Sequence, residues 1–198
     1  MANSDAAFGL KPVCYKGGAP YNGAANVYYV PASDGTALFV GDPVLIAGSG
    51  DAAGVPSITR AAATDRITGV VVGFAPLPSG AAGSTSAVNR GYRTASTEDY
   101  VLVADDVKLL FEVQEDSDTS TLAATSIGLN ADLIIAAGST TTKKSGVELD
   151  SSTAATTSAQ MRIVGAVQRP DNEIGTNAKW LVSIVESAVA PAAGTTGV

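Results

Sequence analysis

The chain contains no histidine and a single cysteine, Cys14. Histidine is the usual general base near neutral pH and the commonest side-chain ligand of transition metals. Its absence excludes Ser-His-Asp and Cys-His catalysis and any zinc site that needs histidine. One cysteine cannot form a disulfide within the chain, which is compatible with synthesis in a reducing cytoplasm. The glycine motifs that hold nucleotide phosphates, GxGxxG and GxxxxGK[ST], are also missing, so we expect no cofactor.

Positive charge and long apolar runs are scarce as well. Twelve Lys and Arg stand against 19 Asp and Glu, which gives a net charge of -7. Nucleic-acid binding depends on Lys and Arg that displace counterions from phosphates. We read the cationic doublet Lys143-Lys144 as a solvated loop tip and expect no nucleic-acid partner. No run reaches the roughly 18 to 20 apolar residues of a membrane-spanning helix, and no signal peptide is visible, so we expect no membrane association.

The pattern that is present is a β pattern. Short segments rich in Val, Ile, Leu and aromatic residues alternate with turn residues, and 45% of the chain is hydrophobic, enough for the core of one domain. We expect about eight or nine strands in a two-sheet sandwich or barrel. The expected strands are 26–30, 37–40, 43–47, 67–74, 100–104, 107–113, 133–137, 161–168 and 178–187. One short helix is expected at 118–126, capped by Asp118 or Ser117.

The two ends of the chain differ from its middle. We expect an irregular N-terminal arm over residues 1–21, a β domain over 22–187 and a flexible tail over 188–198. Long Ser/Thr/Gly loops are expected at 76–86, 138–146 and 150–160. The arm is apolar for its length, so it packs on its own domain or reaches another subunit. The apolar residues of the arm are Phe8, Leu10, Pro12, Val13 and Tyr15.

The densest acidic stretch, VADDVKLLFEVQED at 103–116, is the first candidate for chemistry. Alternation places Val107, Leu109, Phe111 and Val113 on one strand face and a mostly polar set, with Glu112, on the other. The acidic pairs at its two ends lie roughly 30 Å apart along an extended strand, too far for one glycosidase site. We read the stretch as a half-buried strand with acidic turns at both ends.

Other candidates are weaker. DSDTS at 116–120 lacks the third carboxylate position and the glycine of an EF-hand loop, so a calcium site there is a poor match. PDNEIG at 170–175 is interpreted as a turn between two strands. Trp180 is assigned to the core of a central strand. Tyr28 and Tyr29 point to opposite faces of their strand, so at least one ring is a candidate for contact with a partner.

Seven strings together resemble a known family. They are AAFGLKPV, YYVPASDGTALFVGDPV, ITGVVVGF, VADDVKLLFEVQED, GLNADLI, ELDSST and RPDNEIGTNAKWLV, spread from about residue 7 to 186. The sequence resembles the capsid cement or decoration proteins of short-tailed (podovirus-like) phages. The resemblance implies a jelly-roll-like β-sandwich that sits on the outside of a capsid built from an HK97-type major capsid protein.

The leading hypothesis is therefore a non-enzymatic cement protein of the virion, made in the host cytoplasm, with the major capsid protein as partner. Symmetry axes of a shell favour self-association as a dimer or trimer. The expected contact residues are Phe8, Leu10, Pro12, Tyr15, Tyr21 and Tyr28. Deletion of residues 1–15 is expected to abolish shell binding and leave the fold intact.

Two alternatives stay open. The first is a carbohydrate- or host-binding module of the virion surface, in which Tyr28 or Tyr92 stacks on a sugar. The second is a histidine-free hydrolase that uses paired Asp and Glu side chains, a glycosidase being the obvious case.

Overall fold

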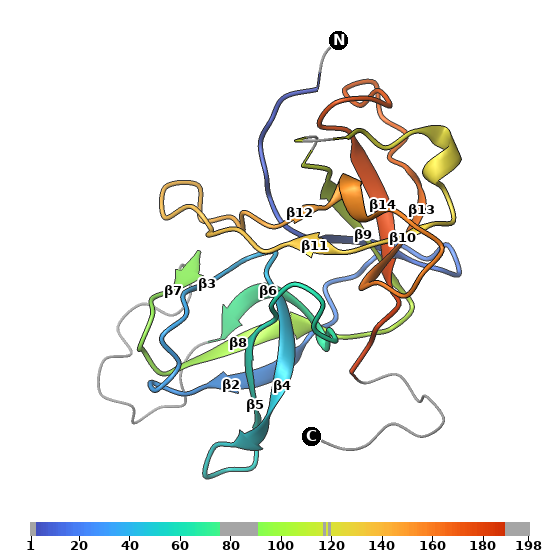
Figure 1. The fold of residues 1–198 in the computed structure, drawn as a ribbon. Helices are drawn as coiled ribbons and strands as arrows, with labels where there is room; N and C mark the ends of the chain where they lie inside the picture. Colours follow the sequence, from blue (N-terminus) through green and yellow to red (C-terminus); the bar gives the residue numbers. More distant parts are fainter. Residues whose placement is uncertain (1–2, 76–90, 117, 119, 189–198) are drawn as a thin grey trace.

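The computed structural model describes residues 3–75, 91–116, 118 and 120–188, and within them the chain is all-β (Figure 1). Most strands are short and joined by long turns, as the glycine- and serine-rich spacers predict. The strands are β1 (Lys11–Tyr15), β2 (Asn26–Val30), β3 (Leu38–Phe39), β4 (Pro43–Gly50), β5 (Pro56–Arg60), β6 (Gly69–Ala75), β7 (Tyr92–Arg93), β8 (Asp99–Ala104), β9 (Leu109–Gln114), β10 (Asn130–Ala131), β11 (Leu133–Ile134), β12 (Glu148–Leu149), β13 (Met161–Ala166) and β14 (Lys179–Ile184).

One half of the molecule is a closed barrel in the order β2-β5-β4-β6-β8, drawn in the lower part of Figure 1. Its strands show the two-residue alternation that a barrel requires. On β8, Val101 and Val103 are fully buried, whereas Tyr100 and Leu102 between them are only half-buried. The β3–β7 pair is a separate two-stranded sheet beside the barrel. Burial of the alternate side chains gives the barrel a core of its own.

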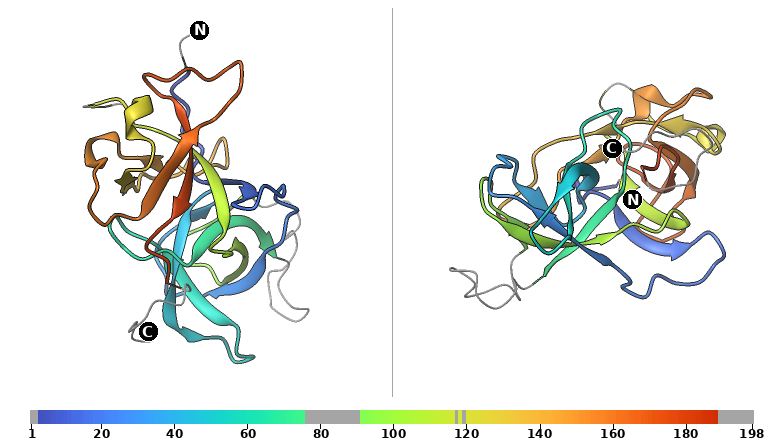
Figure 2. Two further views of the ribbon diagram at one scale, coloured as in Figure 1. Left: turned by 90° about the vertical axis from the view of Figure 1, so that its right-hand side faces the viewer. Right: turned by 90° about the horizontal axis from the view of Figure 1, so that it is seen from below.

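The other half is a five-stranded antiparallel sheet in the order β1-β9-β14-β13-β10. Its central strand, β14, has Trp180 at 0% exposure, which confirms the core assignment of that residue. Figure 2 shows β14, in red, running from the sheet down toward the barrel. Just beyond β14, the Ile67 amide donates to the Glu186 carbonyl at 2.8 Å, and the Ala188 amide donates to the Ile67 carbonyl at 2.9 Å. The end of the sheet is therefore tied to the start of β6.

A buried glutamine, Gln160, forms a second link between the two halves. Its side-chain nitrogen donates to the carbonyls of Ala62 and Asp65 at 3.1 and 2.7 Å, and its side-chain oxygen accepts from the Leu133 amide at 3.1 Å. The larger apolar cluster also crosses the boundary, since it joins Ile67 and Val70 to Trp180. The core of the sheet thus extends onto one side of the barrel, while the barrel also has its separate core.

The sequence predictions are confirmed at the level of strands and fold class. Each of the nine expected segments contains a strand, and the all-β class is confirmed. The jelly-roll arrangement in particular is not confirmed. Five further strands were missed. Three of them, β7, β10 and β12, have only two residues each, and the other two, β1 and β5, each contain a proline. Over 118–126 the regular element is a 3-10 turn at Ala124–Ser126, with Ala123 and not Asp118 at its N-cap.

The irregular N-terminal arm is a wrong prediction for its second half. Residues Lys11–Tyr15 form β1, which pairs antiparallel with β9. Leu10, just before the strand, is only 1% exposed and belongs to the larger core cluster. Nearer the N-terminus, the side chain of Gln114 accepts from the Ala6 amide at 2.9 Å and donates to the Ser4 carbonyl at 2.7 Å. The arm therefore packs on its own domain, because its apolar residues complete the sheet.

Three further expectations concern loops and ends. Residues 138–146 and 150–160 are mostly turns and irregular chain, as predicted, with a 3-10 turn at Ser151–Thr153. The predicted loop 76–86 lies outside the described residues, as does the tail 188–198 apart from Ala188. In the part of the chain that is described, no helix has the length and apolar character needed to cross a membrane.

Candidate functional site

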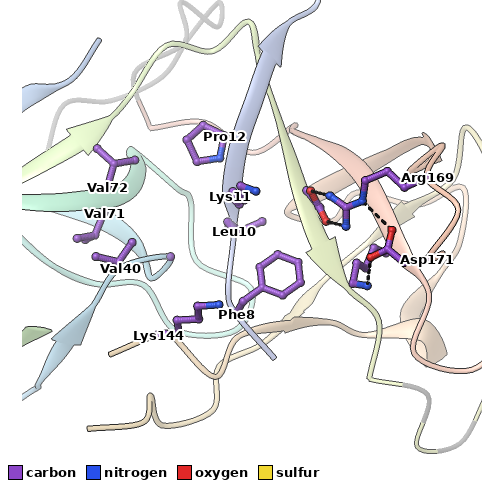
Figure 3. Close-up of a pocket in the computed structure, with 13 residues that line it drawn as sticks. Phe8, Leu10, Lys11, Pro12, Val40, Val71, Val72, Lys144, Arg169 and Asp171 are labelled. Carbon is purple, nitrogen blue, oxygen red and sulfur yellow. Dashed lines mark hydrogen bonds and ion pairs between the residues drawn. The ribbon is translucent and has the colours of Figure 1, made fainter. Parts of the chain in front are cut away.

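A groove of about 530 Å³ opens where β1 approaches the barrel (Figure 3). Figure 3 shows the start of β1 in the middle, the barrel valines on one side, and Arg169 with Asp171 on the other. The groove combines apolar and charged side chains from segments far apart in sequence. We call it the β1 groove, and its lining residues are Phe8, Leu10, Lys11, Pro12, Val40, Gly41, Val71, Val72, Glu112, Lys144, Arg169, Asp171 and Lys179.

Two glycines set the position of the chain that enters the groove. Gly9 has φ 73°, and a Cβ added to it would lie 2.5 Å from the Gly41 carbonyl oxygen. Gly41 has φ 97°, and its own Cβ would lie 2.6 Å from the Phe8 carbonyl oxygen. Because neither residue has a side chain, the two backbones pass close enough for the Leu10 amide to donate to the Gly41 carbonyl at 2.9 Å. This contact fixes Phe8 and Pro12 on either side of the buried Leu10.

The apolar lining is only partly covered. Phe8 and Pro12 from the N-terminal segment are half-buried, and so are Val40 and Val72 from the barrel side. Such side chains retain apolar surface in contact with water, and burying it against a partner is favourable by about 25 cal/mol per Å². The groove is thus suited to receiving an apolar side chain.

An ion-pair network forms the opposite wall. The Arg169 guanidinium binds the Glu112 carboxylate with both terminal nitrogens, at 2.7 and 3.0 Å, and its Nε donates to Asp171 at 3.2 Å. The Lys179 ammonium lies 3.7 Å from the other oxygen of Asp171. Hydrogen bonding to Glu112 raises the pKa of Arg169. Partial desolvation by itself would raise the pKa of Asp171. The neighbouring charges of Arg169 and Lys179 outweigh it, so the pKa of Asp171 is lowered. The guanidinium of Arg169 and the carboxylate of Asp171 therefore keep their opposite charges at neutral pH.

Lys11 and Lys144 complete the groove. Both are exposed, and neither forms an ion pair within the described part of the chain. Figure 3 shows Lys144 near Phe8, with Lys11 further along β1. Lys143, which precedes Lys144 in the chain, lies over the Tyr92 ring with its ammonium 4.4 Å from the ring centroid. Both lysines are exposed, as predicted, but they close the turn at 139–144 and do not lie at its tip, and Lys144 contributes to the groove.

The six predicted contact residues fall in different places. Phe8, Leu10 and Pro12 line the groove, although Leu10 is almost wholly buried. Tyr15 and Tyr21 are half-buried and pack against the larger core cluster, outside the groove lining.

Tyr28 does not offer its ring to a partner, because it lies in the barrel core and is 7% exposed. Its hydroxyl donates to Asp105 at 2.7 Å, and burial together with that carboxylate raises its pKa. Tyr29, on the opposite face of the strand, is half-buried and packs against Tyr100 with ring centroids 5.4 Å apart. The prediction that the two tyrosines point to opposite faces is confirmed. The prediction that Tyr28 contacts a partner conflicts with its position on the buried face.

The strand expected at 107–113 was predicted to be half-buried, and this prediction is wrong. The strand β9 lies between β1 and β14, and every one of its residues is buried. Glu112 and Gln114, assigned to a polar outer face, are covered by Arg169 and by the N-terminal segment. Glu115 is 0% exposed and accepts from the Leu122 amide at 2.8 Å. The alternation of residues along a strand cannot predict that a distant part of the chain will cover its polar face.

The carboxylates that border β9 accept structural hydrogen bonds. Asp105 accepts from Tyr28 and Asn26, Asp106 accepts from the Lys108 amide at 2.7 Å, and Asp116 accepts from the Ser151 amide at 3.0 Å. These contacts fit the turn-forming role expected of Asp at strand ends. Among the described residues, no group of three or more His, Cys, Asp or Glu could hold a metal ion.

Replacing Glu148 with glutamine is expected to stabilise the protein above pH 7. Burial and the charges of Asp5, Asp116 and Asp118 raise the pKa of Glu148 from 4.5 to about 7. The unfolded chain releases this proton at lower pH, so stability falls as pH rises from about 4.5 to 7. With allowance for solvent screening, the gain at pH 8 is about 1 to 2 kcal/mol.

Urea unfolding at pH 4 and pH 8 measures the effect of this substitution, with Glu98→Gln as the control because Glu98 is exposed. The two variants should differ clearly at pH 8 and only slightly at pH 4. An equal response of both variants at pH 8 would show that the environment of Glu148 does not disfavour its charge.

The cations of the groove were the part of the site that sequence reasoning missed. Lys11, Lys144, Arg169 and Lys179 come from four separate segments, and no short motif joins them. The close spacing of Arg169 and Asp171 in RPD was a partial signal of an ion pair, but the segment was interpreted only as a turn. No family model, no curated protein and no solved structure matches the chain.

Proposed function

We propose that this protein is a non-enzymatic structural protein of a phage virion that binds the outside of an assembled HK97-type capsid and cements neighbouring capsomers. The observation that carries the proposal is the β1 groove, a binding surface with partly exposed apolar side chains and two unpaired lysines on a rigid all-β frame. The resemblance of residues 7–186 to capsid cement proteins supplies the capsid as the partner.

A binding role is also supported by the state of the carboxylates. Those of the 103–116 stretch accept hydrogen bonds from backbone amides, tyrosine, asparagine or arginine of this chain. An acid/base pair needs a carboxyl group directed at a substrate. Here the carboxylates hold turns and strands in place, which favours a structural protein over a glycosidase.

The physics of cementing suits a protein of this size. A protein that binds only the assembled shell stabilises that state by mass action. Each contact can be weak if one rigid body bridges two sites, because the second contact then forms at high effective concentration. Self-association as a dimer or trimer at a symmetry axis of the shell would add further contacts. An acidic chain on the outer surface also avoids the packaged DNA.

The jelly-roll-like sandwich implied by the resemblance belongs to the same proposal. Its support in this chain is the core shared by two β layers, the barrel and the sheet. The alternative of a carbohydrate-binding module has less support. The two rings named for it, Tyr28 and Tyr92, are engaged within the protein, the first in the barrel core and the second stacked on Phe39 at 5.1 Å.

Co-sedimentation with purified shells tests the capsid proposal. The protein should sediment with assembled HK97-type shells of its own phage, leave unassembled capsid protein in solution, and raise the temperature at which the shells disrupt. Failure to bind any assembled shell would contradict the proposal. A positive result on a glycan array without shell binding would favour the carbohydrate-binding alternative.

A further inference from the structure

We propose that the β1 groove binds a short peptide segment of a partner protein in which carboxylates flank an apolar side chain. Lys11 and Lys144 bind the carboxylates, and the apolar lining receives the side chain. The inference deepens the proposed function, since identifying the partner as a capsid protein rests on that function. The chemistry of the occupant rests on the groove alone.

The charge balance of the groove favours an anionic occupant. Its lining holds four cations, Lys11, Lys144, Arg169 and Lys179, and two acids, Glu112 and Asp171, so the surplus is 4 − 2 = 2 positive charges. Arg169 neutralises Glu112, and Lys179 lies beside Asp171. The surplus therefore resides on Lys11 and Lys144. In a chain with a net charge of -7, this local excess of positive charge is the opposite of the protein's average.

The apolar lining indicates that charge is only half of the ligand. Phe8, Pro12, Val40 and Val72 are half-buried and open to the groove. A purely anionic ligand would leave this surface exposed to water. A cavity of about 530 Å³ also lies within the range of roughly 300 to 1,000 Å³ that is usual for ligand pockets. An apolar side chain between two carboxylates matches both parts of the lining.

The backbone of β1 is a poor template for adding another strand. β1 is an edge strand of its sheet, but Pro12 has no amide hydrogen, and the register shifts between Pro12 and Cys14. Further along, the Val13 carbonyl accepts from the Tyr21 amide at 3.0 Å. Proline and a bulge are common protections of edge strands. Recognition therefore depends on side chains, and substitutions of Lys11 and Lys144 should be decisive.

Nucleic acid is a less suitable occupant. Among the described residues that line the groove, Lys11 and Lys144 are the only unpaired cations, too few to follow the closely spaced phosphates of a nucleic acid. A short peptide can match two cations with two carboxylates. The test accordingly includes an oligonucleotide as a competing ligand.

The test is an NMR titration of the full-length ¹⁵N-labelled protein with the peptide Glu-Leu-Asp-Phe-Glu up to about 1 mM. Comparison peptides replace the acids by lysine or the apolar residues by glycine, and a single-stranded oligonucleotide is titrated in parallel. We expect the acidic apolar peptide to shift the amides of Leu10, Lys11 and Lys144, and both comparison peptides to bind much more weakly.

Charge reversal then tests the assignment to the two lysines. Lys11→Glu together with Lys144→Glu should weaken peptide binding by roughly tenfold or more. The control carries Lys108→Glu and Lys16→Glu, which change the charge by the same amount at exposed positions outside the groove lining. It should bind the peptide within about twofold of the unaltered protein, because only the overall charge differs. No peptide-induced shift, an equal loss in both variants, or stronger binding of the oligonucleotide would overturn the inference.

The same variants separate this inference from the capsid proposal. If the unaltered protein and the Lys11/Lys144 variant both bind shells equally well, the groove is not the capsid contact. The assignment of its occupant to a capsid subunit then fails while the capsid proposal holds. If the unaltered protein binds the peptide but no shell, the groove chemistry holds and the capsid proposal fails.

Discussion

Replacing Arg93 with methionine is expected to destabilise the protein by about 3 to 5 kcal/mol, the range for removing one partner of a buried charged network. Arg93 is 0% exposed. Its guanidinium donates to the carbonyls of Thr97 and Thr36, each at 2.6 Å, and of Pro31 and Asp34, at 2.9 and 3.0 Å. Methionine has similar length but no donor, so these carbonyls would lose their shared partner.

Urea unfolding measures this loss as a shift in the midpoint at constant slope. Arg66→Met is the matched control, because Arg66 is exposed and surface substitutions usually change stability by less than about 0.5 kcal/mol. Arg93→Lys should lie close to the methionine variant, since a lysine ammonium cannot reproduce the planar fork of donors. Equal midpoints for Arg93→Met and Arg66→Met would show that the carbonyl cluster does not depend on Arg93.

Deleting residues 1–15 is expected to unfold the protein, contrary to the prediction made from the sequence. The deletion removes Leu10 from the core, worth about 1.5 to 3 kcal/mol. It also removes β1 from the edge of β9, where each lost hydrogen bond costs about 0.5 to 1.5 kcal/mol. The sum approaches the roughly 5 kcal/mol at the lower end of domain stabilities. Circular dichroism and urea unfolding measure the outcome.

A shorter deletion is the control. A chain that begins at Phe8 keeps the Gly9–Gly41 contact, Leu10 and β1 but loses the Ser4 and Ala6 partners of Gln114. It should remain folded with a loss of about 1 to 3 kcal/mol, the cost of leaving a buried polar group unsatisfied. If removal of residues 1–15 left the unfolding midpoint unchanged, β1 would contribute nothing to the sheet.

The strands that the sequence predicted are those with a clear apolar pattern. NVYYV and YVLVA are short, continuous apolar runs, and in the structure one face of each looks into the barrel. β1 was missed because KPVCY combines an exposed lysine, a proline and a bulge, and its pairing depends on β9, about one hundred residues away. The closure of the barrel depends on the parallel pairing of β2 with β5, which no local pattern encodes.

The candidate site was predicted in part. The apolar contribution of Phe8, Leu10 and Pro12 followed from the rule that an apolar segment must be buried somewhere, although the segment buries itself within its own chain. The charged wall was not predictable, because Arg169 reaches Glu112 across 57 positions of sequence. Local reasoning also placed Glu112 on a polar outer face. Its burial becomes acceptable only once the guanidinium is in place.

A cryo-EM reconstruction of the virion that contains this chain tests the central proposal most directly. The proposal predicts density for the barrel and sheet on the outer surface of the shell, bridging capsomers, with the β1 groove occupied by a segment of a capsid subunit. Density inside the shell or in the tail alone, or bound chains that each touch a single capsomer, would contradict the cementing function.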